Sequence, residues 1–330
     1  MTSQSDINSH ITHPLRGYFL IAAATFLWGV SAVLGRAVFT GRLSLLGSSP
    51  HSIDPLILSQ TRAGFSFLLL LPILLTARGW QRLKLPRADL IQCVLLGTLG
   101  VAVSNYFYYV AIQRTNVAIA IIVQYTAPVW VLLYVVARGQ QKLSLQKIAA
   151  VVLAVAGIVL VIGIIGGKAR TPLRLDSYGF IAALLASFSF AFYNVAGHSV
   201  LARYDRWLVL LWTLISASVC WLFLNPPWKV VAARYAAAEW IFLFVFSMLS
   251  VLGPFSLYFH GLQYLEPTRA IIASCLEPVF SILLAAAFLG ERLRPIQTLG
   301  IVLVLAAIVI VQRPAVERAA EQPVVVEPIE

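Results

Sequence analysis

Long apolar runs constrain this chain more than any other feature of its sequence. Ten runs of about 20 residues are apolar throughout, and a helix of that length crosses a hydrocarbon core about 30 Å thick. Because the runs do not alternate between apolar and polar with period two, they predict helices and not the strands of a barrel. The predicted spans are 17–38, 56–77, 88–112, 115–137, 146–165, 177–200, 206–225, 238–262, 267–289 and 295–312.

Composition supports lipid as the solvent. Of the 330 residues 60% are hydrophobic and 11% charged, against roughly 45–50% and about 25% in soluble domains, which argues against a soluble enzyme. The net charge of +11 does not indicate nucleic-acid binding, because Lys and Arg lie in short clusters between the apolar runs, where cations meet lipid headgroups. The cysteines sit inside apolar runs, so they predict packing residues and neither a disulfide nor a zinc site: Cys93, Cys220 and Cys275.

The ends of the chain predict an orientation. Residues 1–16 lack the positive segment and cleavage site of a signal peptide, so we expect the first span to stay attached as an uncleaved anchor behind a cytoplasmic segment. Residues 313–330 are rich in Pro and Glu, which predicts a disordered tail. With the N-terminus inside, thirteen cations face the cytoplasm and ten the outside, and this weak excess places both termini in the cytoplasm.

The chain also repeats itself. A shift of 150 residues aligns 111–161 with 261–311 without a gap, and fifteen of the fifty-one pairs are identical, including Gln113 with Gln263 and Pro128 with Pro278. Five spans per copy is an odd number, so the second copy enters the membrane from the opposite side. The predicted fold is an all-α membrane protein of ten transmembrane helices in two inverted five-helix repeats, 17–165 and 177–312, joined by the linker 166–176.

Short motifs carry a resemblance to a known family. Three motifs resemble motifs of the EamA-like branch of the drug/metabolite transporter superfamily: Leu27-Trp28-Gly29, Glu277-Pro278-Val279-Phe280 and Phe288-Leu289-Gly290-Glu291-Arg292-Leu293. The resemblance covers about residues 17–312. The resemblance implies a secondary carrier in a bacterial inner membrane, commonly an exporter of amino acids or related metabolites. The first copy departs from the pattern, because Ala127-Pro128 stands for Glu-Pro and Gln140-Gln141 for Gly-Glu.

Glu277 is the foremost candidate for a functional residue. It lies near the middle of the ninth span, where an ionisable group is costly and usually functional, and Ser274 and Ser281 share its helical face. Pro278 removes an amide donor beside it, which can bend the helix and expose backbone to a cavity. A role in the substrate pathway or in proton coupling is favoured over a buried ion pair with Arg62 or His260.

The other candidates carry two interpretations each. In the fourth span Pro128 indicates either a second broken helix of the site or a packing kink. In the repeat, Pro128 corresponds to Pro278 and Gln124 corresponds to Ser274. Arg62 lies near one end of the second span, so snorkelling to the outer headgroups is favoured over contact with a substrate carboxylate. For His260 a hydrogen-bonded packing role is favoured over a proton relay.

Polar and aromatic residues deep inside their spans favour the lining of a cavity. For each single residue, interhelical hydrogen bonding is the alternative. They lie well inside their spans and need partners for their polar groups: Trp28, Asn105, Tyr106, Tyr108, Tyr109, Tyr193, Asn194 and Tyr258.

The sequence thus predicts a carrier that moves a small metabolite by alternating access, with proton coupling and facilitated diffusion both open. The alternative is a channel-like or lipid-handling protein that uses the same cavity without alternating closure. No phosphate-binding loop, metal-ligand spacing or catalytic triad is present in the sequence, so we expect no enzyme activity, cofactor or metal. The expected partners are the solute, protons and membrane lipids, with no nucleic acid and no obligate protein partner.

Overall fold

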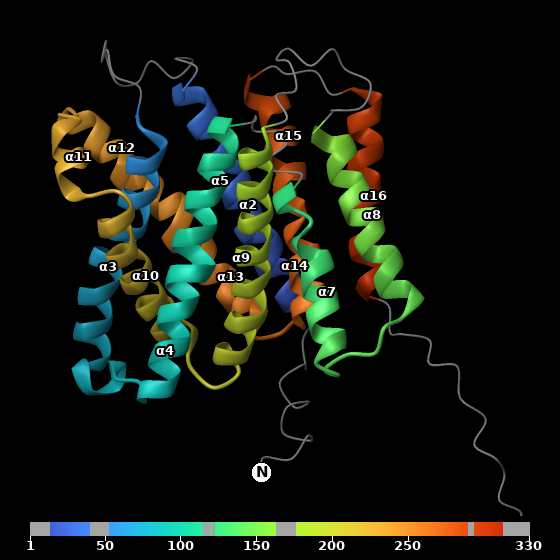
Figure 1. Ribbon diagram of the computed structural model, residues 1–330, viewed down its shortest axis with the longest axis horizontal. Coiled ribbons are helices and arrows are strands. Elements are labelled where there is room, and N and C mark those ends of the chain that lie inside the picture. Colours follow the sequence, from blue (N-terminus) through green and yellow to red (C-terminus); the bar gives the residue numbers. More distant parts are fainter. Residues whose placement is uncertain are drawn as a thin grey trace, which may run out of the picture.

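The computed structural model describes residues 14–39, 53–114, 120, 123–162, 176–289 and 294–312, and all of its regular elements are helical (Figure 1). The predicted all-α class is therefore confirmed for these residues. Residues 1–13 of the predicted N-terminal segment, the tail and nearly all of the linker lie outside the described residues, and residues 14–16 already belong to the first helix.

The helices of the first half are α2 (Pro14–Phe39), α3 (Pro55–Arg78), α4 (Arg87–Leu95), α5 (Val103–Arg114), α7 (Ala127–Ala137) and α8 (Leu145–Ile162), with a short 3-10 turn, η2, at Trp80–Leu83. Those of the second half are α9 (Ser177–Leu201), α10 (Arg206–Leu224), α11 (Pro227–Ala232), α12 (Ala237–Ser247), α13 (Gly253–Leu262), α14 (Pro267–Ser274), α15 (Leu276–Leu289) and α16 (Pro295–Gln312).

Seven helical stretches of the described chain are long and apolar enough to cross a membrane. Three of the ten predicted spans correspond to shorter apolar helices, Ala127–Ala137, Leu145–Leu160 and Pro295–Val311. The fourth span is short because its first residues lie largely outside the described part of the chain.

Two long stretches contain a π-helical segment. η3 (Leu96–Ala102) joins α4 to α5, and η4 (Met248–Leu252) joins α12 to α13. A π-helical turn closes on the fifth residue and widens the helix, a feature that is frequent at functional sites. The two segments lie in the third and eighth predicted spans, which correspond to each other in the repeat.

Two other helices are interrupted. Tyr125 and Thr126 form a turn before α7, and Cys275 separates α14 from α15. Pro128 and Pro278 each lie three residues after the first residue of the break, and neither has the amide hydrogen that would continue the helix. The bends predicted from these prolines are thus present, and a shift of 150 residues superimposes Tyr125 on Cys275.

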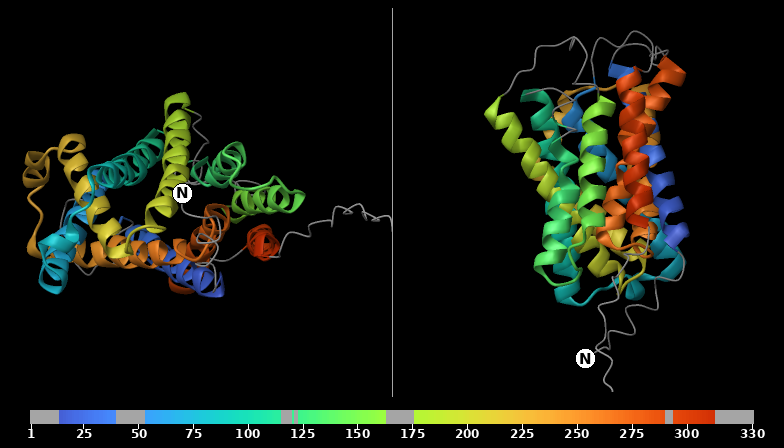
Figure 2. Two further views of the ribbon diagram at one scale, coloured as in Figure 1. Left: turned by 90° about the horizontal axis from the view of Figure 1, so that it is seen from below. Right: turned by 90° about the vertical axis from the view of Figure 1, so that its right-hand side faces the viewer.

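The helices pack in pairs that cross between the halves. α8 runs along α16, α5 along α9, α2 along α13 and α15, and α10 along α3. Seen from below, α8 and α16 lie at the opposite end of the bundle from α11 and α12 (Figure 2, left). Small residues permit the closest approach, because a Cβ on Gly157 would lie 2.8 Å from the Gly300 carbonyl oxygen.

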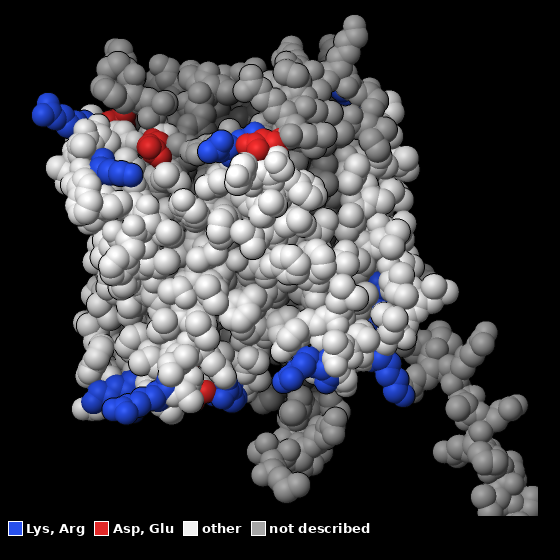
Figure 3. All heavy atoms as spheres, viewed as in Figure 1, with Lys and Arg blue, Asp and Glu red and all other residues white. Residues whose placement is uncertain are grey.

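A broad apolar belt separates two charged ends (Figure 3). Large apolar side chains such as Phe223, 81% exposed, cover the belt, as expected for a surface that faces lipid. The end at which α2 begins holds most of the described cations, namely Arg16, Arg78, Arg82, Lys84, Arg87, Arg138, Lys142, Lys147, Arg203, Arg206 and Arg269.

Candidate functional site

Glu277 lies at the interruption between α14 and α15, halfway along the 22-residue stretch Pro267–Phe288. Its carboxylate accepts a hydrogen bond of 2.7 Å from the Tyr125 hydroxyl, which belongs to the interruption before α7. The Ser281 hydroxyl donates to the Glu277 backbone carbonyl at 2.9 Å and so stays on the helix. The two broken helices, one from each half, therefore meet through a carboxylate and a phenol.

A second polar group lies beside this pair. The Tyr258 hydroxyl of α13 donates to Asn194 Oδ1 of α9 at 2.5 Å, and Asn194 Nδ2 donates to the Phe190 carbonyl at 2.8 Å. Ser274, whose hydroxyl donates to the Ile271 carbonyl at 2.7 Å, lies beside Tyr258, and both are within electrostatic range of the interruption at Cys275 and Glu277. Tyr258, Asn194 and Ser274 are all fully buried, so this group joins α9, α13 and α14 in the interior.

Trp28 and Arg62 converge on one backbone carbonyl. Trp28 Nε1 and Arg62 Nη2 both donate to the carbonyl oxygen of Ser250, at 3.2 and 3.1 Å. Ser250 belongs to the π-helical segment η4. The Arg62 guanidinium also lies 5.6 Å from the Phe246 ring, and its buried Nε has no partner in the part of the chain that the structure describes. The interpretation of Arg62 as a residue that snorkels to the outer headgroups is therefore wrong, because its side chain turns inward to the opened helix.

Aromatic rings surround these polar groups. The Trp28 ring lies 5.3 Å from that of Tyr258 and 5.4 Å from that of Phe255. Tyr193 packs against Tyr258 and Phe259 at 6.0 and 5.5 Å, and its buried hydroxyl has no partner among the described residues. A buried polar atom without a partner often marks a place where water or a ligand is bound.

A separate chain of hydrogen bonds extends from the first interruption. Thr126 and Ser187 share a hydrogen bond of 3.0 Å between their hydroxyls, and Trp130 Nε1 donates to Ser187 at 3.1 Å. The Trp130 ring stacks on Phe188 with centroids 4.2 Å apart. Beyond them lies a cavity of about 540 Å³ between α4, α7 and α9, with a lining that is mainly apolar.

Of the residues singled out in the sequence, seven meet in this interior site: Trp28, Arg62, Tyr193, Asn194, Tyr258, Ser274 and Glu277. Arg62 lies within electrostatic range of Glu277, yet no ion pair joins these two described residues. The alternative interpretation of Glu277, a direct buried ion pair with Arg62, is therefore wrong in this conformation.

His260 lies apart from the site. Its Nε2 is 3.4 Å from the Tyr264 hydroxyl, and the charges that act on it are Arg206, Arg16 and Asp205, at the end where α2 begins. This contact agrees with the packing role that the sequence favoured.

The remaining candidates occupy the helices around the site. Pro128 is buried in the first turn of α7, and Gln124 is partly buried just before the turn. Asn105 and Tyr106 are partly buried on α5, whereas the Tyr109 side chain lies outside the described residues.

Sequence reasoning missed four residues of the site: Tyr125, Thr126, Trp130 and Ser187. A signal for Tyr125 was available, because it precedes Pro128 by three residues as Cys275 precedes Pro278. Within the described ranges, no three or more His, Cys, Asp or Glu side chains gather as a candidate metal site.

Comparison with known proteins decides the family. The model of the EamA-like transporter family matches residues 15–163 and 177–313. The chain belongs to this family. The predicted resemblance is thus confirmed, and this EamA-family protein is a multi-pass membrane transporter.

Relatives of this EamA-family protein include transporters from archaea and bacteria. An uncharacterized transporter of Archaeoglobus fulgidus is 26% identical over 290 residues, which is 87% of this chain and 97% of the relative. An uncharacterized inner membrane transporter of Salmonella typhimurium, YicL, is 24% identical over 71% of this chain and 76% of its own. The threonine/homoserine exporter RhtA of Escherichia coli is 28% identical over 62% of this chain and 65% of its own. A crystal structure 20% identical in sequence shares the fold, with a TM-score of 0.62 over 88% of this chain and 96% of the other.

Proposed function

We propose that this protein is a secondary transporter that exports an amino acid or a related zwitterionic metabolite across the cytoplasmic membrane by alternating access. The observation that carries the proposal is the hydrogen bond between Glu277 and Tyr125, which joins two interrupted helices from opposite halves. Transporter sites of this kind form where broken helices meet near the midplane.

Ten spans in two inverted halves are part of this proposal. Helix pairings support it. In the predicted repeat the third span corresponds to the eighth and the sixth to the first. The third packs on the sixth through α5 and α9, and the eighth packs on the first through α13 and α2. The chain enters α2 at the end marked N and enters α9 at the opposite end (Figure 1). Corresponding π-helical segments and corresponding interruptions add to the argument, as do the two separate matches to the family.

The chemistry of the site suits a zwitterion. The Glu277 carboxylate offers an acceptor to an ammonium group, and the guanidinium of Arg62 keeps a buried Nε–H without a partner for a carboxylate. Rings of Trp28, Tyr193 and Tyr258 provide surfaces for an apolar or amphiphilic side chain. The 28% identity to a threonine/homoserine exporter favours amino acids among the zwitterions.

The test is counterflow in proteoliposomes. Vesicles loaded with unlabelled threonine or homoserine should accumulate the labelled compound, and a panel of amino acids and analogues would define the range. We expect Glu277→Gln to abolish proton-driven accumulation, because a carboxamide cannot carry a proton between the two faces. Glu239→Gln is the matched control, since Glu239 lies at the start of α12 and bonds the Ala236 amide. Full proton-dependent accumulation by Glu277→Gln would exclude the coupling role.

Cytoplasmic termini belong to the same proposal. The excess of described cations at the end where α2 begins supports an inward orientation for that end. The starting protein has Cys93, Cys220 and Cys275 replaced by Ala. Two variants of it each carry one thiol, Arg82→Cys at the end where α2 begins and Lys229→Cys at the opposite end. A membrane-impermeant maleimide should label Lys229→Cys in intact cells and Arg82→Cys only after permeabilisation. The opposite pattern would reverse the orientation.

A further inference from the structure

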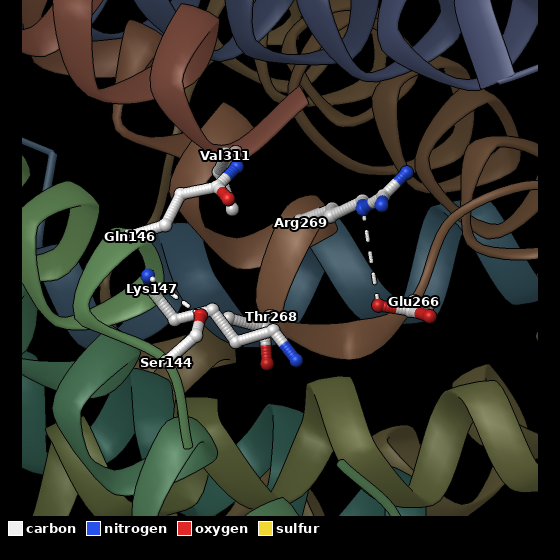
Figure 4. A pocket seen from close by; sticks show the side chains of 7 residues that line it. All are labelled: Ser144, Gln146, Lys147, Glu266, Thr268, Arg269 and Val311. Carbon is white, nitrogen blue, oxygen red and sulfur yellow. Dashed lines mark hydrogen bonds and ion pairs between the residues drawn. The ribbon is translucent and has the colours of Figure 1, made fainter. Parts of the chain in front are cut away.

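A polar pocket lies at the end of the molecule where α2 begins, away from the interior site. It has a volume of about 180 Å³ and lies between the start of α8, the start of α14 and the end of α16 (Figure 4). α8 belongs to the first half of the chain and α14 and α16 to the second, so both halves form its walls. Its lining residues are Ser144, Gln146, Lys147, Glu266, Thr268, Arg269 and Val311.

The charges of the pocket are not balanced. Lys147 makes no ion pair with a described residue, and its ammonium group donates only to the Lys142 carbonyl, at 3.3 Å. Arg269 uses Nε on Glu266 at 3.8 Å, and its terminal nitrogens have no acceptor among the described residues. Glu266 is the one carboxylate of the lining, it makes its ion pair with Arg269, and it also accepts from Gln141 at 3.1 Å. Two cations and one occupied carboxylate therefore leave one positive charge in the pocket.

The donors of the pocket come from both halves of the chain. In Figure 4 the Lys147 side chain extends from α8 toward Thr268, and the dashed ion pair joins Arg269 to Glu266. Ser144 Oγ accepts from the Lys147 backbone amide at 3.3 Å, so its own hydrogen is available to a ligand. An ammonium, a guanidinium and a hydroxyl in one lining offer several separate donors, which suit a tetrahedral anion with three or four oxygens better than a planar carboxylate, which one guanidinium satisfies. A volume of about 180 Å³ also leaves room for bridging waters, each of which occupies about 30 Å³ in the liquid.

We propose that this pocket binds a phosphate group, which Lys147 contacts from the first half and Arg269 from the second. A phosphate in this position links the two halves at one end of the molecule and stabilises the conformation in which that end is closed. The same chemistry is offered by free phosphate compounds and by the headgroup of a phosphatidic acid in the adjoining leaflet. The proposal concerns binding and does not depend on which solute is transported.

The experiment is a thermal-unfolding titration of the purified full chain, followed by tryptophan fluorescence. Inorganic phosphate, compared with chloride at equal ionic strength, should raise the Tm by about 3 °C at ten times its Kd. Lys147→Gln and Arg269→Gln should each remove most of this shift, and Lys147→Arg should retain it because the charge is kept. Lys84→Gln is the matched control, since it removes a cation from the same end of the molecule outside the pocket.

A second arm separates the two sources of phosphate. The chain is placed in phosphatidylcholine nanodiscs with or without phosphatidic acid, and the same variants are compared. A Tm shift from phosphatidic acid alone, lost in Lys147→Gln, assigns the site to a lipid headgroup, and a shift from inorganic phosphate assigns it to a soluble ligand. If neither probe shifts the Tm, or if Lys84→Gln loses the shift as fully as Lys147→Gln, the proposal is wrong.

Discussion

A single hydroxyl distinguishes Tyr125 from phenylalanine, and in this chain that hydroxyl is the group that holds Glu277. Tyr125→Phe keeps the ring and removes the donor, so the carboxylate loses a charge-assisted bond of about 1.5–3 kcal/mol. We expect counterflow to fall about tenfold, since a loss of 1.4 kcal/mol in positioning corresponds to a factor of ten.

The matched control for Tyr125→Phe is Tyr178→Phe. It makes the same chemical change at the start of α9, at an exposed hydroxyl that bonds no described residue. Transport by Tyr178→Phe should stay close to that of the unmodified protein. Equal losses in both variants would mean that the Tyr125 hydroxyl has no special part in the site.

Individual residues were predictable from the sequence where their cost in a membrane is high. Glu277 stood out because a carboxyl group in mid-span is expensive without a role. Tyr125 did not, because a tyrosine among apolar residues is common and its partner lies 152 positions away along the chain. The inward direction of Arg62 was also beyond sequence reasoning, since it depends on a carbonyl exposed by the π-helical turn of another helix.

At the scale of elements, η4 is held by side chains from two neighbouring helices. Trp28 of α2 and Arg62 of α3 donate to the same Ser250 carbonyl. We expect Trp28→Phe alone to cost about 1 kcal/mol or less, because Arg62 still satisfies the oxygen. Trp28→Phe combined with Arg62→Leu should cost about 1 kcal/mol more than the sum of the single changes. Additive losses in unfolding free energy would show that the two donors act independently.

Helix packing allows a test with two glycines. A Cβ on Gly157 of α8 would lie 2.8 Å from the Gly300 carbonyl oxygen of α16, whereas one on Gly64 of α3 would meet nothing within 4 Å. Gly157→Ala should therefore lower the stability by about 1–3 kcal/mol through overpacking. Gly64→Ala should lose nothing, because alanine favours a helix more than glycine does. The Tm of both variants in detergent gives the comparison, and an equal loss in both would contradict the close approach of α8 and α16.

The elements themselves were well predicted from apolar runs, but their interruptions were predicted only where a proline marks them. Pro128 and Pro278 indicated the breaks before α7 and α15. No residue type in the sequence predicts η3 or η4, because a π-helical turn is stabilised by packing against neighbouring helices and not by local propensity. The sequence therefore predicts spans better than it predicts the carbonyls that a span exposes.

At the scale of the whole molecule, the two halves touch at the end where α2 begins. Gln141, in the loop between α7 and α8, donates to Glu266 at 3.1 Å and accepts from Thr268 at 3.3 Å. Gln141 belongs to the first half, and its two partners belong to the second. A solute that passes between the halves at this end requires these contacts to separate.

This contact distinguishes a carrier from a channel-like protein. In a background without Cys93, Cys220 and Cys275, the pair Gln141→Cys and Thr268→Cys allows oxidation to join the halves. A carrier must open this end in every cycle, so we expect oxidation to stop counterflow and a reductant to restore it. Each single cysteine variant, treated with the same oxidant, should keep its activity. Undiminished flux through the cross-linked protein would favour a path that does not close in alternation, because the locked halves could no longer rock.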